Sequence, residues 1–428
     1  MIIEDEEIFF PETRDGMEFL VYAPLRGYLI QALPQLKDEL TNPASPIRQA
    51  FITKLKNKNY TDPKKTLDDL YRSVPGLSIP ITNDCNLRCK YCYFSAGDES
   101  KSQSMSCEMI KQCVDTYFSR LDDYSIWEDG NYLGVSIAGG GEPTCRFNEM
   151  KYAIDYVTQK CEARGLKPRF SMPTNGVYGD EMRQYIVDHF SHVSLSMDGP
   201  KFIHDKQRPT KTGKGSFDAV YETGKYFLEA GMSFTIRSTV SRFSLPHIED
   251  MLNFFNDEFP GIKVGLEPLD YLGRAMTGDD ELLPPDTEEF AARLAEAYEH
   301  AGRLGTTVRN SAVGHFELLT PFFCRNACGP GWVFTVDGRI IACTRDPEGD
   351  GFCFGTYDSV HGSYAIDESK IATLRSQNVL NYEECSDCFM KYNCGGDCPH
   401  KRQLGMRQCE TTRQVGLFVL RQRLGLEG

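Results

Sequence analysis

The sequence predicts an α/β fold, a partial (β/α)6 barrel with a small α+β unit before it and a cysteine-rich domain after it. Three observations support this prediction. Residues 76–304 alternate strand-like with helix-like segments, residues 1–84 contain none of the 16 cysteines, and nine cysteines lie between residues 324 and 409. At 428 residues the chain is too long for one ordinary core, so two or three domains are expected.

Residues 1–75 make up the first unit. Strand-like runs at 18–23 and 28–33 flank an Arg26-Gly27 turn, and a helical stretch follows at 47–55. Two roles fit such a unit. It either packs as a cap on the larger domain or forms a platform that binds a substrate peptide.

Residues 76–304 carry the barrel pattern. We expect strands at 77–81, 132–138, 169–174, 192–197, 234–240 and 263–266, and helices at 107–121, 148–164, 180–189, 217–230, 246–259 and 287–304. Repeated β-α units predict a parallel sheet with right-handed crossovers. On such sheets the functional residues gather at the C-terminal ends of the strands, where the motifs below fall.

Residues 305–428 change character, because segments shorten and glycine and cysteine become dense. A hairpin is expected from 332–336 and 339–343 around a tight turn at Asp337-Gly338. A final amphipathic helix is expected at 411–424.

Composition narrows the class of protein. Hydrophobic residues at 40% and charged residues at 25% are ordinary for a soluble globular chain. No apolar run reaches the ~18 residues of a membrane span, and the acidic N-terminus lacks a secretion signal, so we expect a cytoplasmic protein without a membrane partner. The net charge of −14 argues against a nucleic-acid partner. In a reducing cytoplasm, 16 cysteines indicate metal binding or catalysis.

Three cysteines directly follow the first predicted strand, as Cys85-x3-Cys89-x2-Cys92. Thiolates at this spacing suit one corner of an iron–sulfur cubane. Three ligands leave one iron without a protein donor, which is what a metal needs to bind and activate a small molecule. A structural zinc site is the alternative, but zinc needs four ligands and no fourth lies nearby.

A C-x3-C-x2-C loop after the first strand of a partial barrel resembles the radical SAM superfamily. The resemblance implies that S-adenosylmethionine chelates the open iron of a 4Fe–4S cluster through its amino and carboxylate groups. The reduced cluster then breaks the sulfonium C–S bond, and the resulting 5′-deoxyadenosyl radical abstracts a hydrogen atom from the substrate.

Two later motifs strengthen the resemblance. Gly139-Gly140-Gly141-Glu142 is by itself a Gly-rich turn, but at the end of the second strand it resembles the superfamily's GGE motif, which binds the methionine amino group. The run from Ser196 through His204 to Arg208 resembles the S-x-D-G-P…H-D-x-x-R pattern of peptide-modifying members. The resemblance implies that Ser196 and Arg208 contact the cofactor.

Further cofactor contacts are predicted from side-chain chemistry at strand ends. Small hydroxyl and amide groups suit ribose hydroxyls, and an arginine suits a carboxylate. A ring beside the third cysteine, or the end of the sixth strand, would lie near adenine. The candidates are Asn175, Ser194, Arg237, Tyr91 and Leu269. Turn chemistry and simple surface exposure are the alternatives.

Eight of the nine C-terminal cysteines would be the number needed for two four-thiolate sites. Their spacing suits zinc ribbons as well as iron–sulfur clusters. The series from Cys328 to Cys409 resembles the SPASM domain, which occurs in maturases of sulfatases and of ribosomally made peptides. The resemblance implies auxiliary cluster I on Cys324, Cys328, Cys343 and Cys398, and auxiliary cluster II on Cys385, Cys388, Cys394 and Cys409.

Some cysteines remain less certain. Cys324 precedes the fixed-spacing part of the motif, and without it cluster I would have an open iron. Cys353 is either a replacement ligand or a free thiol. We expect the other cysteines to be small buried hydrophobic residues, namely Cys107, Cys113, Cys145 and Cys161.

The predicted function is oxidative maturation of a ribosomally synthesised precursor peptide by a thioether or carbon–carbon crosslink. Sulfatase maturases carry an aspartate base directly after the cysteine that corresponds to Cys343, where this chain has Thr344. The nearest carboxylate, Asp346, is the one candidate for a catalytic residue. Formylglycine formation on a sulfatase is the enzyme alternative, and a non-catalytic zinc-binding interaction protein is the other. Expected partners are a precursor peptide with a leader and a reductant such as flavodoxin or ferredoxin.

Overall fold

The chain is described here from a computed structural model, which describes residues 2–3, 5–12, 19–98, 100, 102–127, 130–277, 282–314, 316–329, 331–345 and 351–426. The chain divides into two compact units, and each is described by itself. Unit 1 comprises Met1–Tyr71, Ser311–Cys328 and Arg375–Gly428. Unit 2 comprises Arg72–Asn310 and Gly329–Leu374.

Unit 2 is built on one sheet of mixed direction, with strand order β11-β10-β9-β8-β7-β6-β5-β12-β13-β14-β15. The strands from β11 to β12 are parallel, as the barrel pattern predicts. Their bounds are β5 Leu77–Ser78, β6 Tyr132–Ser136, β7 Lys167–Thr174, β8 His192–Ser196, β9 Phe234–Val240, β10 Val264–Pro268 and β11 Val308–Arg309. The predicted α/β barrel class is confirmed.

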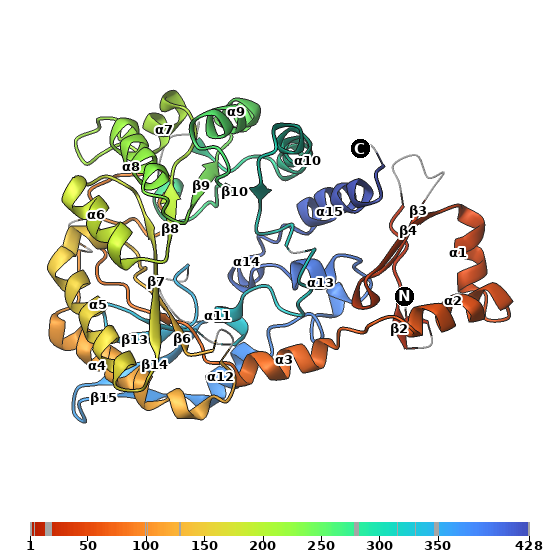
Figure 1. The fold of residues 1–428 in the computed structure, drawn as a ribbon, viewed down its shortest axis with the longest axis horizontal. Coiled ribbons are helices and arrows are strands. Elements are labelled where there is room, and N and C mark those ends of the chain that lie inside the picture. The colour runs from red at the N-terminus through yellow and green to blue at the C-terminus, as the bar shows by residue number, and fades with distance from the viewer. Residues whose placement is uncertain are drawn as a thin grey trace. The chain divides into compact units, whose positions relative to one another are not determined.

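Each barrel strand alternates between a buried apolar face and a more open polar face. Leu195 and Ile236 lie on the buried face, with relative exposures of 0% and 1%. Figure 1 shows helices such as α5, α6 and α8 running alongside β6, β7 and β8. The opposite face is richer in polar and small side chains, because alternate positions on a strand point to opposite sides. Ser194, Ser196 and Arg237 lie on this second face.

The helices of unit 2 begin and end at recognisable residues. The Ser106 side chain accepts one backbone hydrogen bond at the start of α4, and Asp286 accepts two at the start of α10. Gly305 in the left-handed region ends α10. The bounds are α4 Cys107–Ser119, α5 Phe147–Glu162, α6 Asp180–His189, α7 Lys201–Gln207, α8 Phe217–Glu229, α9 Ile248–Glu258, α10 Thr287–Leu304 and α12 Glu368–Arg375.

Four strands from the cysteine-rich segment extend the barrel sheet, which the sequence did not reveal. The predicted hairpin is present as β12 (Trp332–Phe334) and β13 (Arg339–Ile341), followed by β14 (Cys353–Asp358) and β15 (Ser363–Ile366). β12 pairs in parallel with β5, so this segment continues the sheet of unit 2. The compact units therefore do not follow three consecutive segments 1–75, 76–304 and 305–428. Separate roles for those segments stay a prediction.

Unit 1 brings the N-terminal residues together with most of the second cysteine group. β3 (Phe19–Ala23) and β4 (Tyr28–Ala32) form a hairpin in which Phe19 and Val21 pack on Ile52 and Leu55. The other elements are β1 (Ile2–Ile3), β2 (Glu6–Glu7), α1 (Pro34–Thr41), α2 (Pro46–Lys56), α3 (Pro63–Arg72), α11 (Arg325–Cys328), α13 (Lys391–Cys394), α14 (Pro399–Gln403) and α15 (Cys409–Arg423). Among the described residues we find no helix with the length and apolarity of a bilayer span.

Candidate functional site

The three-cysteine loop leaves β5 at the C-terminal edge of the barrel sheet. Cys85, Cys89 and Cys92 are each partly buried. The loop pairs with the segment after α7, because the Arg88 amide donates to Pro209 O at 2.7 Å and the Lys90 amide donates to Gln207 O at 2.9 Å. These bonds hold the loop across the mouth of the barrel.

N–H groups point at all three sulfur atoms. The Leu87 amide lies 3.5 Å from Cys85 Sγ, the Ala96 amide 3.4 Å from Cys92 Sγ, and Arg208 Nη1 3.8 Å from Cys89 Sγ. Hydrogen bonds to sulfur are a standard way of stabilising cluster thiolates. The donor set therefore fits an iron–sulfur cluster with three protein ligands.

Burial raises the pKa of the Cys85 thiol to about 12, and the Glu142 carboxylate adds to this shift. Burial likewise raises the pKa of Cys89 to about 11, and the opposing effect of the Arg208 charge does not cancel it. Both thiols are therefore protonated at neutral pH until a metal binds. Ligation must release these protons, so metal binding is coupled to pH.

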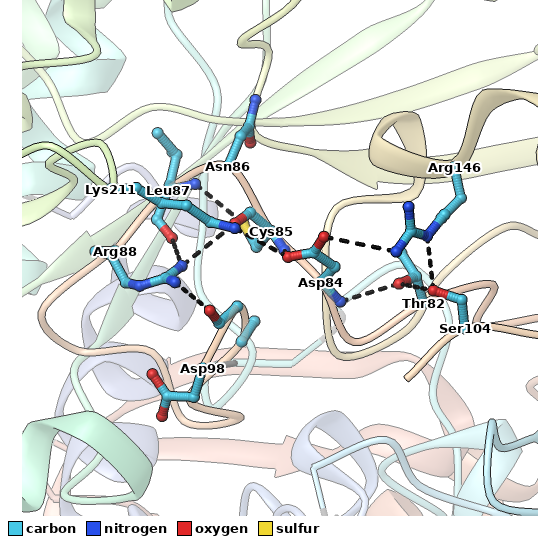
Figure 2. A network of polar contacts seen from close by, with 12 residues as sticks. Thr82, Asp84, Cys85, Asn86, Leu87, Arg88, Asp98, Ser104, Arg146 and Lys211 are labelled. Atoms are coloured by element: carbon cyan, nitrogen blue, oxygen red, sulfur yellow. Dashed lines mark hydrogen bonds and ion pairs between the residues drawn. The ribbon is translucent and has the colours of Figure 1, made fainter. Parts of the chain in front are cut away.

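A polar network supports the base of the loop (Figure 2). The Asp84 carboxylate lies 3.1 Å from Lys211 Nζ and 3.9 Å from Arg146 Nη2. Burial alone would raise the pKa of Asp84, but the Lys211 hydrogen bond and the two cations leave this pKa below its usual value. The Arg88 guanidinium donates to the carbonyl oxygens of Cys85 and Leu87. The backbone of the first cysteine is thus fixed from both sides.

The GGE turn packs directly against the cysteine loop. A Cβ on Gly140 would lie 2.0 Å from the Phe94 ring, and one on Gly141 would lie 2.0 Å from Asp84 O. Only glycine allows this approach. In the structure these glycines pack against Phe94 and Asp84 of the same chain. Their contact with a cofactor stays a prediction.

Glu142 is 3% exposed and is held by the end of β7. Its Oε1 accepts hydrogen bonds from Thr144 Oγ1 at 2.9 Å and Thr174 Oγ1 at 3.0 Å, and its Oε2 accepts from the Asn175 amide at 2.7 Å. Burial raises the pKa of Glu142, although these bonds oppose the shift. Oε2 retains lone-pair capacity for one further donor, such as an ammonium group.

Asn175 binds the cysteine loop through its side chain. Nδ2 donates to Asn86 Oδ1 at 2.7 Å and lies 3.6 Å from Cys85 Sγ, while Oδ1 accepts from the Val177 amide at 2.9 Å. Both ends of the amide are therefore used within the protein. A contact between Asn175 and the ribose stays a prediction. In the structure the Asn175 side chain instead contacts Cys85 and Asn86 of the cysteine loop.

Asp198 is the buried centre of the site, with 0% exposure. Its Oδ2 accepts from Tyr91 Oη at 2.6 Å, Gln207 Nε2 at 2.9 Å and Arg208 Nε at 3.1 Å, and its Oδ1 accepts from the Thr239 amide at 3.0 Å. One carboxylate thus joins the residue before the third cysteine, the cationic side chain beside Cys89 and the end of β9. Asp198 stands inside the S-x-D-G-P pattern, but the pattern alone did not predict this role.

Tyr91 and Arg208 are both oriented by this carboxylate. The Arg208 guanidinium carbon lies 5.2 Å from the centroid of the Tyr91 ring. The pKa of Tyr91 is raised well above its usual value by burial, and the pKa of Arg208 is raised because the buried Asp198 charge outweighs desolvation. The pair remains a neutral phenol and a cation at every pH the enzyme meets.

His204 determines the shape of the segment that carries Arg208. Its Nδ1 accepts from the Asp198 amide at 3.3 Å, and its Nε2 lies 3.0 Å from Ser216 Oγ, which donates to Arg208 O at 2.6 Å. Since the Ser216 proton is already used, His204 donates from Nε2 and is neutral. Burial lowers the pKa of His204 to about 4, which agrees with this assignment.

Arg274 is a second site residue that no sequence motif predicts. It lies in the 3-10 helix Gly273–Thr277, far from the cysteines in sequence. Its Nη1 donates to Cys89 O at 2.8 Å, its Nη2 donates to Ala96 O at 2.9 Å, and its amide donates to Cys92 O at 2.9 Å. These three hydrogen bonds form only in the folded chain, and no local sequence pattern predicts them.

The other predicted cofactor contacts lie at neighbouring strand ends. Ser196 stands beside Arg237 in the β8–β9 register. Ser194 and Ser196 are partly buried, Arg237 is exposed, and Leu269 is 3% exposed with its amide bonded to Val240 O. Ser194, Ser196 and Arg237 thus share one face of the sheet. The cofactor contacts of these four residues stay predictions.

The segment after Cys343 reaches the cysteine loop within unit 2. Thr344 forms a side-chain hydrogen bond with Tyr93, the residue after Cys92. The Arg345 guanidinium lies 5.7 Å from the Tyr93 ring centroid and pairs with Asp270. Asp346, the candidate catalytic residue, lies outside the described residues.

The predicted auxiliary ligands in unit 1 gather in two groups. Cys388 is close enough to Cys385, Cys394 and Cys409 to raise the pKa of each thiol, second to burial and other charges. Cys324 is coupled in the same way to Cys328 and Cys398. Cys343 lies in unit 2, after β13. Within the described ranges, no three His, Cys, Asp or Glu side chains converge on one point as the ligands of a single ion do.

The remaining cysteines differ from each other. Cys113 and Cys161 are buried as predicted, but Cys107 is exposed and Cys145 is only partly buried, so that prediction was wrong for the last two. Cys107 opens α4, where the first turn faces solvent. Cys145 lies in the 3-10 helix after Glu142, close to Cys85. The Cys353 thiol lies 3.5 Å from Gly355 O.

A comparison with family models assigns this geometry to a known group. The model of the radical SAM superfamily matches residues 79–255, which span the cysteine loop, the GGE turn, Asp198 and Arg208. Residues 79–255 of this chain thus form a radical SAM domain. The chain is therefore an enzyme, which overturns the alternative of a non-catalytic zinc-binding protein.

Curated relatives of this radical SAM enzyme include two sulfatase maturases. A serine-type anaerobic sulfatase-maturating enzyme of Bacteroides thetaiotaomicron is 23% identical over 76% of this chain and 82% of its own length. A cysteine-type enzyme of Clostridium perfringens is 25% identical over 81% of this chain and 93% of its own length.

Solved structures agree on the fold. Native anSMEcpe with bound AdoMet and Cp18Cys peptide has a TM-score of 0.65 at 19% identity, covering 82% of this chain and 98% of that chain. Streptococcus suis SuiB bound to precursor peptide SuiA has a TM-score of 0.52 at 15% identity, covering 93% and 95%. At these identities the likeness establishes a shared fold. The radical SAM enzyme is thus of the anSME and SuiB structural type.

Proposed function

We propose that this radical SAM enzyme oxidatively modifies a ribosomally synthesised precursor peptide, forming a thioether or carbon–carbon crosslink. The observation that carries the proposal is the loop at the barrel mouth, where each of three thiols faces an N–H donor. Those thiols would hold a 4Fe–4S cluster whose fourth iron is open to S-adenosylmethionine. When bound, this pair supplies a 5′-deoxyadenosyl radical that removes a hydrogen atom from the peptide.

The chain's own residues bind and orient the cofactor in this proposal. Glu142 Oε2 accepts the methionine ammonium, since that oxygen accepts one hydrogen bond among the described residues. Arg208 keeps its charge beside Cys89, and its planar guanidinium would bind the methionine carboxylate of the cofactor. Asp198 touches neither group directly and acts by positioning Arg208 and Tyr91.

Thr344 favours crosslinking over formylglycine formation. The resemblance to sulfatase maturases places a catalytic aspartate at this position, and a threonine hydroxyl cannot act as a base at neutral pH. In this chain the Thr344 side chain is hydrogen-bonded to Tyr93 beside the third cysteine. Formylglycine formation remains the second candidate, because the curated relatives named above are sulfatase maturases.

The auxiliary cysteines would hold two further 4Fe–4S clusters with the ligand sets given above. Forming a new bond after hydrogen abstraction requires the substrate radical to lose an electron. Nearby iron–sulfur centres can accept it. An external reductant such as flavodoxin or ferredoxin would reduce the first cluster, and a reducing cytoplasm would keep the thiols available.

The hairpin of unit 1 offers an edge for a leader peptide. Isolated bridges pair Phe9 with Tyr22 and Glu12 with Phe19, so a third segment lies along β3. In the described part of the chain, β4 pairs with β3 alone. An extended peptide can add a strand to such an edge, with main-chain hydrogen bonds supplying affinity.

The charge of α2 favours an acidic leader. α2 carries Arg48, Lys54 and Lys56 and no acidic residue, in a chain of net charge −14. Lys54 Nζ and Lys58 Nζ lie 5.8 Å and 5.5 Å from the ring centroid of Tyr28, the first residue of β4. Two ammonium groups thus stand at one end of the β4 edge.

A binding titration tests the leader surface. We expect Lys54→Glu combined with Lys58→Glu in the full-length enzyme to weaken binding of an acidic leader peptide about tenfold or more, and more strongly at low salt. Lys64→Glu, on an exposed position of α3, is the matched control and should leave affinity unchanged. Equal affinities in all three proteins would contradict leader binding at this edge.

A product assay separates the two reactions. Anaerobically reconstituted enzyme is incubated with S-adenosylmethionine, dithionite and a precursor peptide encoded beside its gene, or with a sulfatase peptide. Crosslinking removes two hydrogen atoms from the peptide and prevents fragmentation inside the new ring. The crosslinked product contains no aldehyde. Formylglycine reacts with a hydrazide. A hydrazide-reactive sulfatase peptide together with an unchanged precursor would overturn crosslinking in favour of formylglycine.

A further inference from the structure

The turn between Cys394 and Cys398 has an unusual backbone. Gly395, Gly396 and Asp397 all have positive φ, at 67°, 92° and 67°. An aspartate in this region is uncommon, because its Cβ crowds the backbone there. Glycine would occupy the position without cost, so the side chain of Asp397 must contribute something that glycine lacks.

Asp397 is 2% exposed, and both of its carboxylate oxygens accept hydrogen bonds. Oδ1 accepts from the Cys398 amide at 2.6 Å, and Oδ2 accepts from the Gln408 amide at 2.6 Å. The Asp397 amide lies 3.2 Å from Cys394 Sγ. One residue therefore connects three points of the cysteine-rich segment.

These three points belong to both predicted ligand sets. Cys398 is a predicted ligand of cluster I, Cys394 is a predicted ligand of cluster II, and Gln408 directly precedes Cys409, also of cluster II. The packing of the turn leaves little freedom, because a Cβ on Gly395 would lie 2.2 Å from the Phe322 backbone, two residues before Cys324. The buried carboxylate thus bonds the amide of a predicted cluster I ligand and the amide that precedes a predicted cluster II ligand.

The charge of Asp397 lies near the predicted ligands. Its two oxygens bond the amide of Cys398 and the amide of Gln408, the residue before Cys409, so the carboxylate lies close to ligand-bearing backbone of both sets. Adding an electron to a cluster adds negative charge in the same place, so a buried carboxylate disfavours reduction as it disfavours ionisation.

We propose that Asp397 is a positioning residue shared by both auxiliary clusters, whose carboxylate ties their cysteine-bearing turns together and makes the clusters harder to reduce. The inference rests on the auxiliary clusters of the proposed function. Its consequence is that the two clusters are not independent, because one side chain sets the geometry and charge of both.

Two variants of the full-length, anaerobically reconstituted enzyme test this. Asp397→Asn keeps the shape and the left-handed preference but removes the charge. At a fixed potential near the midpoint, we expect its ratio of reduced to oxidised auxiliary cluster, measured by EPR titration, to rise at least threefold. Asp397→Gly keeps the backbone and removes both bridges, and we expect it to lose about four to eight irons per chain.

Asp5→Asn is the control, since Asp5 also has positive φ but is exposed. It should match the wild type in iron content and titration. A wild type with about four irons would overturn the auxiliary clusters and this inference together. A wild type with about twelve irons, and variants that keep both the iron and the titration curve, would overturn the role of Asp397 alone. If Asp397→Asn does not fold, full iron retention in Asp397→Gly overturns the role.

Discussion

The two cysteine regions of this enzyme are held by different means. The thiols of the barrel loop are aligned by side chains from distant strand ends, such as Asn175, Asp198 and Arg274. The thiols around Cys388 and Cys394 sit on turns and helices of three to five residues, closed by local backbone bonds. We therefore expect the barrel to form its cysteine loop without metal, and the second region to depend on what its cysteines bind.

This difference has a physical basis. A loop across a packed parallel sheet inherits its position from a core that is stable without it. Helices of one turn are not stable in water by themselves, because nucleation costs more than one hydrogen bond returns. Metal binding then supplies folding free energy directly. We expect the two regions to respond differently to the same treatments.

Removing iron should produce the largest contrast. After anaerobic chelation, we expect amide exchange in residues 383–403 of unit 1 to accelerate about a hundredfold or more, while β6 to β9 keep their protection. Hydrogen exchange followed by mass spectrometry on holo and chelated protein measures both regions at once. Undiminished protection in residues 383–403 would show that the local turns are self-sufficient.

The barrel loop should instead be sensitive to single distant side chains. Asp198→Asn removes the charge partner of Arg208, and we expect deoxyadenosine formation to fall about a hundredfold through misplacement of the loop. Chromatographic quantification after reduction with dithionite gives the rate. Asp205→Asn, on α7 between Asp198 and Arg208 but bonded to the Phe217 amide, should retain the wild-type rate. A wild-type rate in Asp198→Asn would contradict the positioning role of Asp198.

The neutral His204 predicts a pH effect confined to the barrel. Its pKa is about 4 in the fold against 6.5 in the unfolded chain, so the unfolded state binds a proton first as pH falls. Stability is therefore lost between about pH 6.5 and 4, by up to about 1.4 kcal/mol per pH unit. Denaturant unfolding of His204→Gln should show a flatter pH dependence than the wild type. Parallel curves would contradict the assignment.

The smallest effect is expected for cysteines outside both regions. Cys353→Ser should keep all iron and change stability by less than about 0.5 kcal/mol, because its thiol contacts only a backbone oxygen among the described residues. Iron analysis and thermal melting provide the comparison. Loss of about one cluster's iron would instead make Cys353 a ligand.

Periodicity and spacing predicted most of the barrel. The strand at 234–240 and the helices at 180–189 and 287–304 have the expected bounds, because long alternating or amphipathic runs leave little ambiguity. The pairing of β12 with β5 was not predictable, because the local sequence of a short strand does not indicate which distant strand it pairs with.

The site was predictable only in part for the same reason. The cysteine spacing and the GGE turn are local signals, and the structure brings them together. Arg274 is separated from Cys89 by nearly half the chain, and no spacing rule connects them. Asp198 was visible as part of a motif, but its four hydrogen bonds exist only after folding.

The most direct test is the replacement of Cys85, Cys89 and Cys92 by alanine. The triple variant is reconstituted anaerobically, reduced with dithionite and supplied with S-adenosylmethionine. We predict loss of about four irons and no deoxyadenosine above the enzyme-free background, with the second cysteine region still loaded. Deoxyadenosine released at the wild-type rate would contradict the three-thiolate cluster on which the proposed chemistry depends.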